Sequence, residues 1–335
     1  MSNSNLKNLL NEYEKKRLNS IYEAEKRKEK IYAENPRLGE IDDILSKEAI
    51  RVSKLLIVSK DDNLLNELNK KIESLKQEKI KILSSIGKTL DDLKPIYECK
   101  DCKDTGYITE NFNTNMCHCL KQKLFDIEYN KSNIYNLEKQ NFNNFSLALY
   151  SDEVDEAKYN SKISPRENIE KIKKLALKFI ENFDNENEKN LLFTGNTGLG
   201  KSFLSSCIAN EILKKGKTVL YQTAPVMLDT IIDYRFGKEN SSKDIYDNLL
   251  NVDLLIIDDL GTECMNTMKF SELFNIINTR LLNSNNKVTK TIISTNLSLQ
   301  NLFSTYDERI VSRIVGNYNI CYFFGDDIRF KINRH

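Results

Sequence analysis

The residues best suited to chemistry form a glycine-rich stretch in the second half of the chain. An apolar run leads into Gly195, and four residues separate this glycine from Gly200-Lys201-Ser202, which opens a segment with helical periodicity. A strand, a glycine loop and a helix in this order are the context that a phosphate-binding loop requires. Glycines let backbone N–H groups converge on phosphate oxygens, and the helix N-terminus adds the positive end of its dipole. The sequence therefore predicts an ATP-binding loop made of Gly195, Asn196, Thr197, Gly198, Leu199, Gly200, Lys201 and Ser202.

Two acids further along the chain complete the expected phosphate chemistry. Lys201 is expected to reach the β- and γ-phosphates of ATP, and the Ser202 hydroxyl to ligate Mg²⁺. The apolar residues 254–257 run directly into Asp258 and Asp259. A buried parallel strand delivers carboxylates in this way to its carboxyl end, where such sheets bind ligands. We expect Asp258 to hold Mg²⁺ through water and Asp259 to polarise the attacking water.

Polar residues after the next two strands are further candidates. Asn296 ends an apolar strand and is placed to orient the attacking water; the alternative is an asparagine that caps a turn. Arg309 and Arg313 are four residues apart and share one helical face. An arginine that reaches the γ-phosphate of a neighbouring subunit would neutralise charge in the transition state, and Arg313 is the stronger candidate, although surface arginines commonly serve only as ion-pair partners. Arg329 is the last candidate nucleotide contact.

Four of the seven cysteines lie close together in the sequence. A C-x-x-C pair and a C-x-C pair flank a loop that contains turn-forming glycine and asparagine residues. Four thiolates can hold tetrahedral Zn²⁺ and leave no open coordination position, so the expected metal is structural and not catalytic. Disulfides are the competing interpretation, and His118 could replace one of its neighbours as a ligand. The candidate zinc ligands are Cys99, Cys102, Cys117 and Cys119.

Composition sets broad limits on the protein. Among 335 residues, 50 Lys and Arg stand against 49 Asp and Glu, so the formal net charge of +1 does not indicate a nucleic-acid or membrane-surface binder. No apolar run approaches the roughly 18 residues of a membrane span, and no signal peptide is recognisable. We therefore expect a soluble cytoplasmic protein without a membrane partner.

Residues 1–95 are rich in Glu, Lys, Leu and Ile and predict helices throughout. The most regular stretch places apolar residues three and four apart, at Leu65, Leu68, Ile72, Leu75, Ile82 and Ile86, with Lys79 at the remaining position. Such a stripe belongs either to a module that docks on a protein partner or to a helical hairpin that buries its own seam. The sequence leaves both interpretations open.

In this order, the loop ending in Gly200-Lys201-Ser202, the run Asp258-Asp259-Leu260-Gly261, the run Ser294-Thr295-Asn296 and the arginine pair resemble the AAA+ ATPase of DnaC/DnaI-type bacterial replicative helicase loaders, within the IstB-like superfamily. The resemblance covers about residues 140–335. It implies that Asn296 is sensor 1, Arg313 the arginine finger and Arg329 sensor 2. It also implies an α/β fold with a central parallel sheet and no C-terminal helical lid.

The resemblance also gives the expected organisation. A helical partner-binding region at 1–95 precedes a zinc-binding module at 96–122, a connector at 123–164 and the AAA+ ATPase domain at 165–335. Within the connector, Phe142, Phe145, Leu147 and Leu149 either lie near the nucleotide base or belong to an ordinary core.

The function implied is ATP-dependent loading of the replicative hexameric DNA helicase onto single-stranded DNA during replication initiation, with self-association through the AAA+ domains and slow hydrolysis. Tyr234-Arg235-Phe236, with Lys238 and Lys243, could stack on and neutralise a single strand; the alternative is an amphipathic helix with core aromatics. Two other functions compete: an IstB-like transposition helper ATPase acting on duplex DNA, and a binding adaptor whose nucleotide is only a conformational switch.

Overall fold

A computed structural model of the chain describes residues 3–58, 62–110, 112–128, 139–237, 243–264, 266–283 and 287–332. The chain divides into two compact units. Residues 7–115 form a helical unit, and residues 116–335 together with the first six residues form an α/β unit. In the ranges described, no helix is both long and apolar enough to cross a membrane.

The α/β unit is built on a five-stranded parallel sheet, in the strand order β4-β5-β6-β3-β7. Every residue of β3 and β6 is buried, as expected for strands in the middle of a sheet that is covered on both faces. The sheet confirms the expected α/β fold with a central parallel sheet. The strands are β3 (Asn190–Thr194), β4 (Val219–Thr223), β5 (Leu254–Leu260), β6 (Lys290–Thr295) and β7 (Tyr318–Tyr322).

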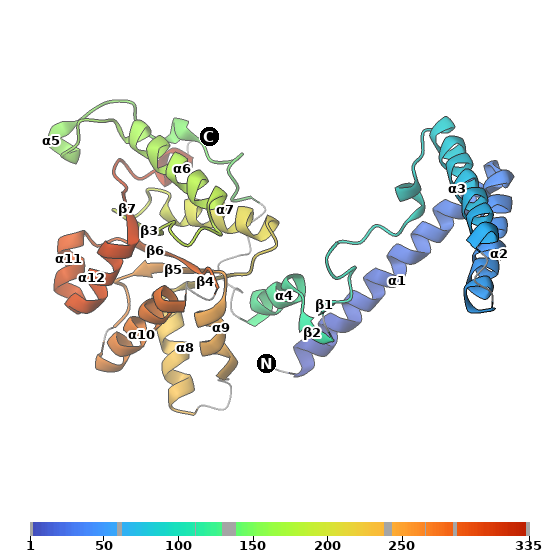
Figure 1. The fold of residues 1–335 in the computed structure, drawn as a ribbon. Coiled ribbons are helices and arrows are strands. Elements are labelled where there is room, and N and C mark those ends of the chain that lie inside the picture. The colour runs from blue at the N-terminus through green and yellow to red at the C-terminus, as the bar shows by residue number, and fades with distance from the viewer. Residues whose placement is uncertain are drawn as a thin grey trace. The chain divides into compact units, whose positions relative to one another are not determined.

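Helices cover both faces of this sheet (Figure 1). Alternate residues of each strand face opposite layers, so Tyr221 and Ile256 pack with α6 and α7, whereas Leu220 and Leu255 pack with α8, α10 and α12. The glycine loop leads from β3 into α7, which covers one of these two faces of the sheet. The helices are α6 (Pro165–Glu181), α7 (Lys201–Lys214), α8 (Ala224–Arg235), α9 (Lys243–Asn251), α10 (Thr267–Asn283), α11 (Leu299–Thr305) and α12 (Glu308–Asn317), with the short α5 (Glu156–Tyr159), η2 (Leu147–Leu149) and α13 (Arg329–Ile332).

Helix α4 (His118–Glu128) is anchored to the edge strand β4. The Val219 N–H donates to Gln122 Oε1 at 2.7 Å, and Gln122 Nε2 donates to the Val219 carbonyl at 3.0 Å. One side chain thus pairs with a backbone N–H and C=O that no neighbouring strand reaches. Phe125, one turn later, is buried in the same core as α8.

A buried arginine fixes the amino ends of two central strands. Arg280 of α10 is 2% exposed, and its guanidinium donates to the Leu249, Val252 and Lys290 carbonyls at 2.8, 3.0 and 2.7 Å. These bonds join the end of α9 to the starts of β5 and β6. Burial lowers the pKa of Arg280 to about 10, which still leaves it charged at neutral pH.

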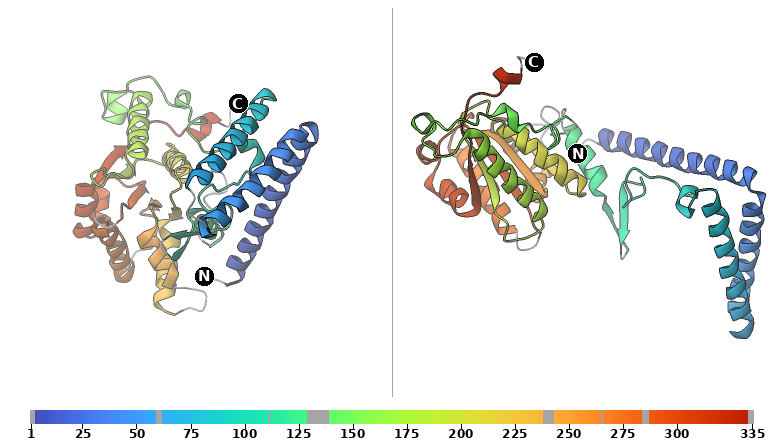
Figure 2. Two further views of the ribbon diagram at one scale, coloured as in Figure 1. Left: turned by 45° about the vertical axis from the view of Figure 1, so that its right-hand side comes forward. Right: turned by 90° about the horizontal axis from the view of Figure 1, so that it is seen from above.

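The helical unit contains three long helices and the beginning of a hairpin (Figure 2). Helices α2 and α3 run side by side, and α1 extends away from them. The elements are α1 (Asn3–Glu34), α2 (Pro36–Val58), α3 (Asp62–Ser85), η1 (Leu90–Leu93), β1 (Tyr107–Glu110) and β2 (Asn113–Met116).

The predicted apolar stripe of α3 is covered in part by the chain's own helices. Leu68 and Leu75 are buried, whereas Ile86 is exposed. Leu83, which was not part of the predicted stripe, is buried and packs with residues at the end of α1 and the start of α2. The polar seam residue Lys79 donates to Asp42 of α2, which also accepts from the Tyr32 hydroxyl at 2.6 Å. Within the described residues, the buried part of the stripe therefore resembles a hairpin seam, and the Lys79–Asp42 pair helps to fix its register.

Candidate functional site

The glycine loop lies between β3 and the N-terminus of α7, at the carboxyl edge of the sheet. Gly195 has a φ of 143°, and a Cβ at this position would lie 2.1 Å from the Phe323 carbonyl oxygen. Gly198 has a φ of 73°, and its Cβ would lie 2.1 Å from the Asp327 carboxylate. Both positions require glycine because the segment after β7 passes directly against the loop.

Lys201 occupies the centre of this loop. Its ammonium donates to the Gly195 carbonyl at 2.6 Å, the Asn196 carbonyl at 2.7 Å and Asn296 Oδ1 at 2.8 Å. The side chain is buried, and burial lowers its pKa to about 8, while the carboxylates of Asp259 and Asp258 act in the opposite direction. A desolvated ammonium held by neutral oxygens is suited to receive an anionic ligand.

The two acids at the end of β5 have different surroundings. Asp258 is buried, and its carboxylate accepts hydrogen bonds from the hydroxyls of Tyr221, at 2.8 Å, and Ser294. Asp259 is half-buried, with a left-handed backbone at φ 54°, a conformation that is uncommon for a residue other than glycine. Burial and the neighbouring Asp258 raise the pKa of Asp259, which makes it a better proton acceptor than an ordinary aspartate.

A cavity of about 470 Å³ brings most of the predicted site residues together. Asp259 and Asn296 line it from the ends of β5 and β6, and Arg329 lines it from α13. The Arg329 guanidinium is paired with Asp327, and the Ile328 N–H donates to the Gly198 carbonyl at 2.9 Å, so the segment after β7 forms one wall. The lining residues are Gln140, Thr197, Gly198, Leu199, Gly200, Lys201, Ser202, Phe203, Asp259, Thr262, Asn296, Ile328 and Arg329. Of these, the sequence analysis did not single out Gln140, Phe203, Thr262 and Ile328.

A smaller, mostly apolar pocket of about 250 Å³ adjoins this cavity. The two share Gly200, Phe203 and Ile328. Phe145 and Leu149 of the connector line it, and both of them, like Phe142 and Leu147, also pack in or against the core of the α6–α7 layer. An apolar pocket beside a phosphate-binding loop is suited to bind a nucleotide base.

The residues around the larger cavity fit a nucleoside triphosphate with a divalent cation. The backbone cradle, the Lys201 ammonium and the Arg329 guanidinium suit phosphate oxygens. The Ser202 hydroxyl and the Asp258 carboxylate are oxygen donors of the kind that Mg²⁺ prefers, and the Tyr221 phenol hydrogen bonds to both.

The arginine pair of α12 lies outside the lining of this cavity. Arg313 Nε donates to Asn278 Oδ1 at 2.6 Å, and its guanidinium lies 4.5 Å from the centre of the Phe274 ring. Arg309 is exposed and paired with Asp307. The described part of the chain therefore gives neither arginine to the cavity of its own subunit.

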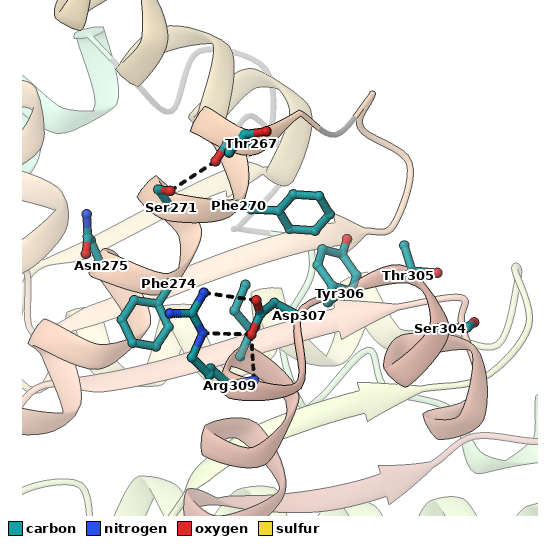
Figure 3. A pocket seen from close by; sticks show the side chains of 11 residues that line it. Thr267, Phe270, Ser271, Phe274, Asn275, Ser304, Thr305, Tyr306, Asp307 and Arg309 are labelled. Carbon is teal, nitrogen blue, oxygen red and sulfur yellow. Dashed lines mark hydrogen bonds and ion pairs between the residues drawn. The ribbon is translucent and has the colours of Figure 1, made fainter.

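Arg309 instead borders a second, open pocket of about 500 Å³ between α10 and the α11–α12 connection. Figure 3 shows its guanidinium directed at Asp307 and beside the ring of Phe274, with the rings of Phe270 and Tyr306 farther along the pocket. The Tyr306 hydroxyl donates to Glu263, which accepts the Gly261 N–H at 2.9 Å. A hydrogen-bonded path thus links this pocket to the loop that follows Asp259.

The aromatic-basic cluster predicted to contact single-stranded DNA is only partly available. Arg235 is bonded to Glu272 at 2.9 Å and covers the Tyr246 ring, so its charge is already compensated. Phe236 is 67% exposed. Lys238 and the side chain of Lys243 lie outside the described residues.

The four predicted zinc ligands lie together. The Cys102 sulfur accepts the Gly106 N–H at 3.4 Å, a contact that stabilises a thiolate. His118 belongs to a second group of potential ligands, with Cys99 and Asp101. A set of four thiolates fits the tetrahedral coordination of structural Zn²⁺. The sulfur atoms that all lie within 4.8 Å of one another are those of Cys99, Cys102, Cys117 and Cys119.

Several known proteins are similar to this chain over the same region. A stretch of 158 residues is 29% identical to the replicative helicase loader DnaC of Escherichia coli K12, and it covers 47% of this chain and 62% of that protein. For the replicative helicase loader DnaC of Buchnera aphidicola, strain Bp, the identity is 31% over 157 residues, with 46% and 62% covered. The chain thus spans about three-fifths of the length of these curated relatives.

Among solved structures, a DnaC helicase loader is 22% identical, with a TM-score of 0.42, and the alignment covers 57% of this chain and 99% of that one. The DnaI structure is 23% identical, with a TM-score of 0.41, and 55% and 90% are covered. The family model described as IstB-like ATP binding protein matches residues 135–332, which is more than half of the chain. The chain therefore belongs to the family of IstB-like ATP binding proteins.

Proposed function

We propose that the chain binds ATP with Mg²⁺, hydrolyses it, and uses this cycle to load a replicative DNA helicase onto single-stranded DNA during replication initiation. The nucleotide part rests on the convergence of Lys201, Asp259, Asn296 and Arg329 around one cavity at the carboxyl edge of the sheet. The loader part is supported by the similarity of this region to replicative helicase loaders.

In this proposal, each polar residue of the cavity has a distinct role. Lys201 and Arg329 bind phosphate oxygens, and Ser202 and Asp258 hold Mg²⁺, which would offset phosphate charge when bound. Asp259, with its raised pKa, accepts a proton from the attacking water, and Asn296 orients that water. The adjoining pocket beside Phe145 receives the adenine ring.

Arg313 acts on the nucleotide of a neighbouring copy, because Asn278 and Phe274 hold it outside the cavity of its own chain. Complementation between subunits tests this role. Lys201→Ala chains should not hydrolyse ATP, and Arg313→Ala chains should bind ATP but lose roughly 10³-fold or more in rate. Mixing the two should restore turnover, since the first supplies an intact arginine to the ATP bound by the second. No recovery on mixing would assign Arg313 a role within its own chain.

The cysteine group holds a structural Zn²⁺, and the helical unit binds the hexameric helicase. Zinc would stabilise a short hairpin segment that has few buried apolar residues of its own. For the described residues of the helical unit, large apolar side chains remain exposed at Leu18, Tyr22 and Ile50. These give a partner helix apolar area to bury.

Helicase loading can be measured directly with the full chain. The replicative helicase of the same bacterium is mixed with a closed single-stranded DNA circle, and the DNA-bound helicase is separated by gel filtration. The wild-type chain with ATP should increase bound helicase, and Lys201→Ala should not. If the chain leaves the helicase unbound and instead associates with duplex DNA when ATP is present, the transposition-helper function takes precedence. Loading without turnover would favour the adaptor.

A further inference from the structure

Tyr221 is a buried tyrosine that joins the two halves of the magnesium site. It lies on β4, where the strand register pairs Thr223 with Asp258 of β5. Residues two apart in a strand share a face, so Tyr221 lies diagonally across from Asp258 on the side that packs against α7. Its side chain is 2% exposed, and its hydroxyl donates to Asp258 Oδ2 at 2.8 Å.

The other side of the same hydroxyl faces the start of α7. Ser202 and Ser206, one helical turn apart, both hydrogen bond to the Tyr221 oxygen. Ser202 follows Lys201 in the glycine loop and is exposed toward the cavity. One phenol therefore contacts the hydroxyl proposed to ligate Mg²⁺ and the carboxylate proposed to hold it.

The direction of these bonds follows from the number of protons. A tyrosine hydroxyl is protonated at neutral pH, so the phenol has a single proton to donate. That proton goes to the Asp258 carboxylate, which has none to give. The phenol oxygen must then accept the proton of Ser202, and the Ser202 lone pairs are left facing the cavity.

The second oxygen of Asp258 is held independently. Asp258 Oδ1 accepts from the Ser294 hydroxyl and from the Asp259 N–H, the latter at 3.2 Å. With Tyr221 on one oxygen and Ser294 on the other, the carboxylate plane is fixed before any cation arrives. Outer-shell partners of this kind orient the ligands of a metal and raise its affinity.

We propose that Tyr221 is a positioning residue of the magnesium site, which directs the lone pairs of Ser202 and the carboxylate of Asp258 toward one cation. The proposal rests on the proposed ATP and Mg²⁺ binding and adds a residue that the nucleotide itself does not touch. The loss of its hydroxyl should weaken Mg²⁺ binding while leaving metal-independent nucleotide binding in place.

The test uses the full-length Tyr221→Phe variant and a fluorescent ATP analogue, mant-ATP, over a range of Mg²⁺ concentrations. In EDTA, the variant should bind mant-ATP as the wild type does. The Mg²⁺ concentration that gives half of the metal-dependent increase in affinity should rise about tenfold, and excess Mg²⁺ should restore wild-type affinity.

Tyr318→Phe is the matched control. Tyr318 is also buried and hydrogen bonded, to Thr291, but it lies at the opposite, amino end of the sheet. Its loss should leave the Mg²⁺ dependence unchanged. A drop in thermal stability of Tyr221→Phe, as large as that of the control and without a change in Mg²⁺ dependence, would make Tyr221 a purely structural residue and overturn the proposal.

A double-mutant cycle with Ser202→Ala separates positioning from a general loss of structure. If Tyr221 acts through Ser202, the effect of Tyr221→Phe on Mg²⁺ dependence should shrink in the Ser202→Ala background. If the effects of the two substitutions on Mg²⁺ dependence are fully additive, Tyr221 does not act through Ser202. Wild-type protein that fails to bind mant-ATP at all would refute the proposed function itself, which is a different outcome from unaltered Mg²⁺ dependence in the variant.

Discussion

Replacement of Lys201 by methionine should make the nucleotide-free protein more stable while abolishing nucleotide binding. Burial lowers the pKa of Lys201 from 10.5 to about 8. At 1.36 kcal/mol for each pKa unit, the charged form costs at most about 3 kcal/mol in the folded state. Because the cavity is open to solvent, we expect about 1–2 kcal/mol. The half-exposed acceptors Gly195 and Asn296 can bond to water once the ammonium is gone.

The sign of the pH dependence follows from proton binding. Between about pH 8 and pH 10.5 the unfolded chain keeps the Lys201 proton and the folded chain releases it, so the stability of the wild type rises with pH through this window. Below about pH 8 both states are protonated, and the full cost remains. The advantage of Lys201→Met should therefore be largest near neutral pH and should shrink as the pH approaches 10.

Differential scanning calorimetry measures both effects. Near pH 7 without nucleotide, Lys201→Met should unfold about 2–8 °C above the wild type, given about 2–4 °C for each kcal/mol in a unit of this size. ATP and Mg²⁺ at about 100 times the dissociation constant should then stabilise the wild type by about 2.7 kcal/mol and leave the variant unchanged. Lys290→Met is the control for the loss of nucleotide binding. Lys290 is also buried and bonded to backbone carbonyls, but it lies away from the cavity. A variant that is less stable than the wild type at neutral pH, with no pH-dependent difference, would refute the reasoning.

Three further predictions concern the loop, the core and the cysteines. Gly195→Ala should abolish ATP binding and lower the unfolding temperature, since its Cβ would meet the Phe323 carbonyl at 2.1 Å; calorimetry with and without ATP checks this. Arg280→Met should cost about 3–5 kcal/mol in urea denaturation, because it leaves buried carbonyls without donors, and Arg280→Lys should recover part of that loss. Cys102→Ser should remove the zinc measured by mass spectrometry of the purified protein and render the hairpin segment sensitive to protease, whereas Cys207→Ser should retain the metal.

The sequence predicts the loop at 195–202 well because its chemistry is local. A glycine at each tight position and a lysine at the first turn of the helix determine their own geometry, and the structure places them between β3 and α7. The run that ends in Asp258 and Asp259 is predictable for a similar reason, since a continuous apolar strand in a parallel sheet delivers the next residues of the chain to the carboxyl edge. Asn296 is predictable for the same reason. It follows the neighbouring strand β6 at the carboxyl edge, where its side chain accepts a hydrogen bond from Lys201.

Positions that depend on long-range packing were not predicted as site residues. Alternation along β4 says that Tyr221 is buried, but its bond to Asp258 depends on the register between β4 and β5, which no local pattern encodes. Gln140 and Ile328 line the cavity because distant segments of chain return to the glycine loop. The hydroxyl of a tyrosine in a buried strand was the available signal for Tyr221, since a buried phenol requires a hydrogen-bond partner.

The charges around the cavity explain why hydrolysis would depend on a second copy. Lys201, Arg329 and Asp259 line the cavity, and the buried Asp258 adjoins Asp259, so these two cations and two carboxylates contribute no net positive charge. A triphosphate bound with one Mg²⁺ is still anionic, and the transition state concentrates negative charge on the transferred phosphoryl oxygens. Backbone N–H groups of the glycine loop stabilise part of this negative charge. We propose that Arg313, which Asn278 holds on α12 outside the cavity of its own chain, supplies the remaining positive charge when two copies associate.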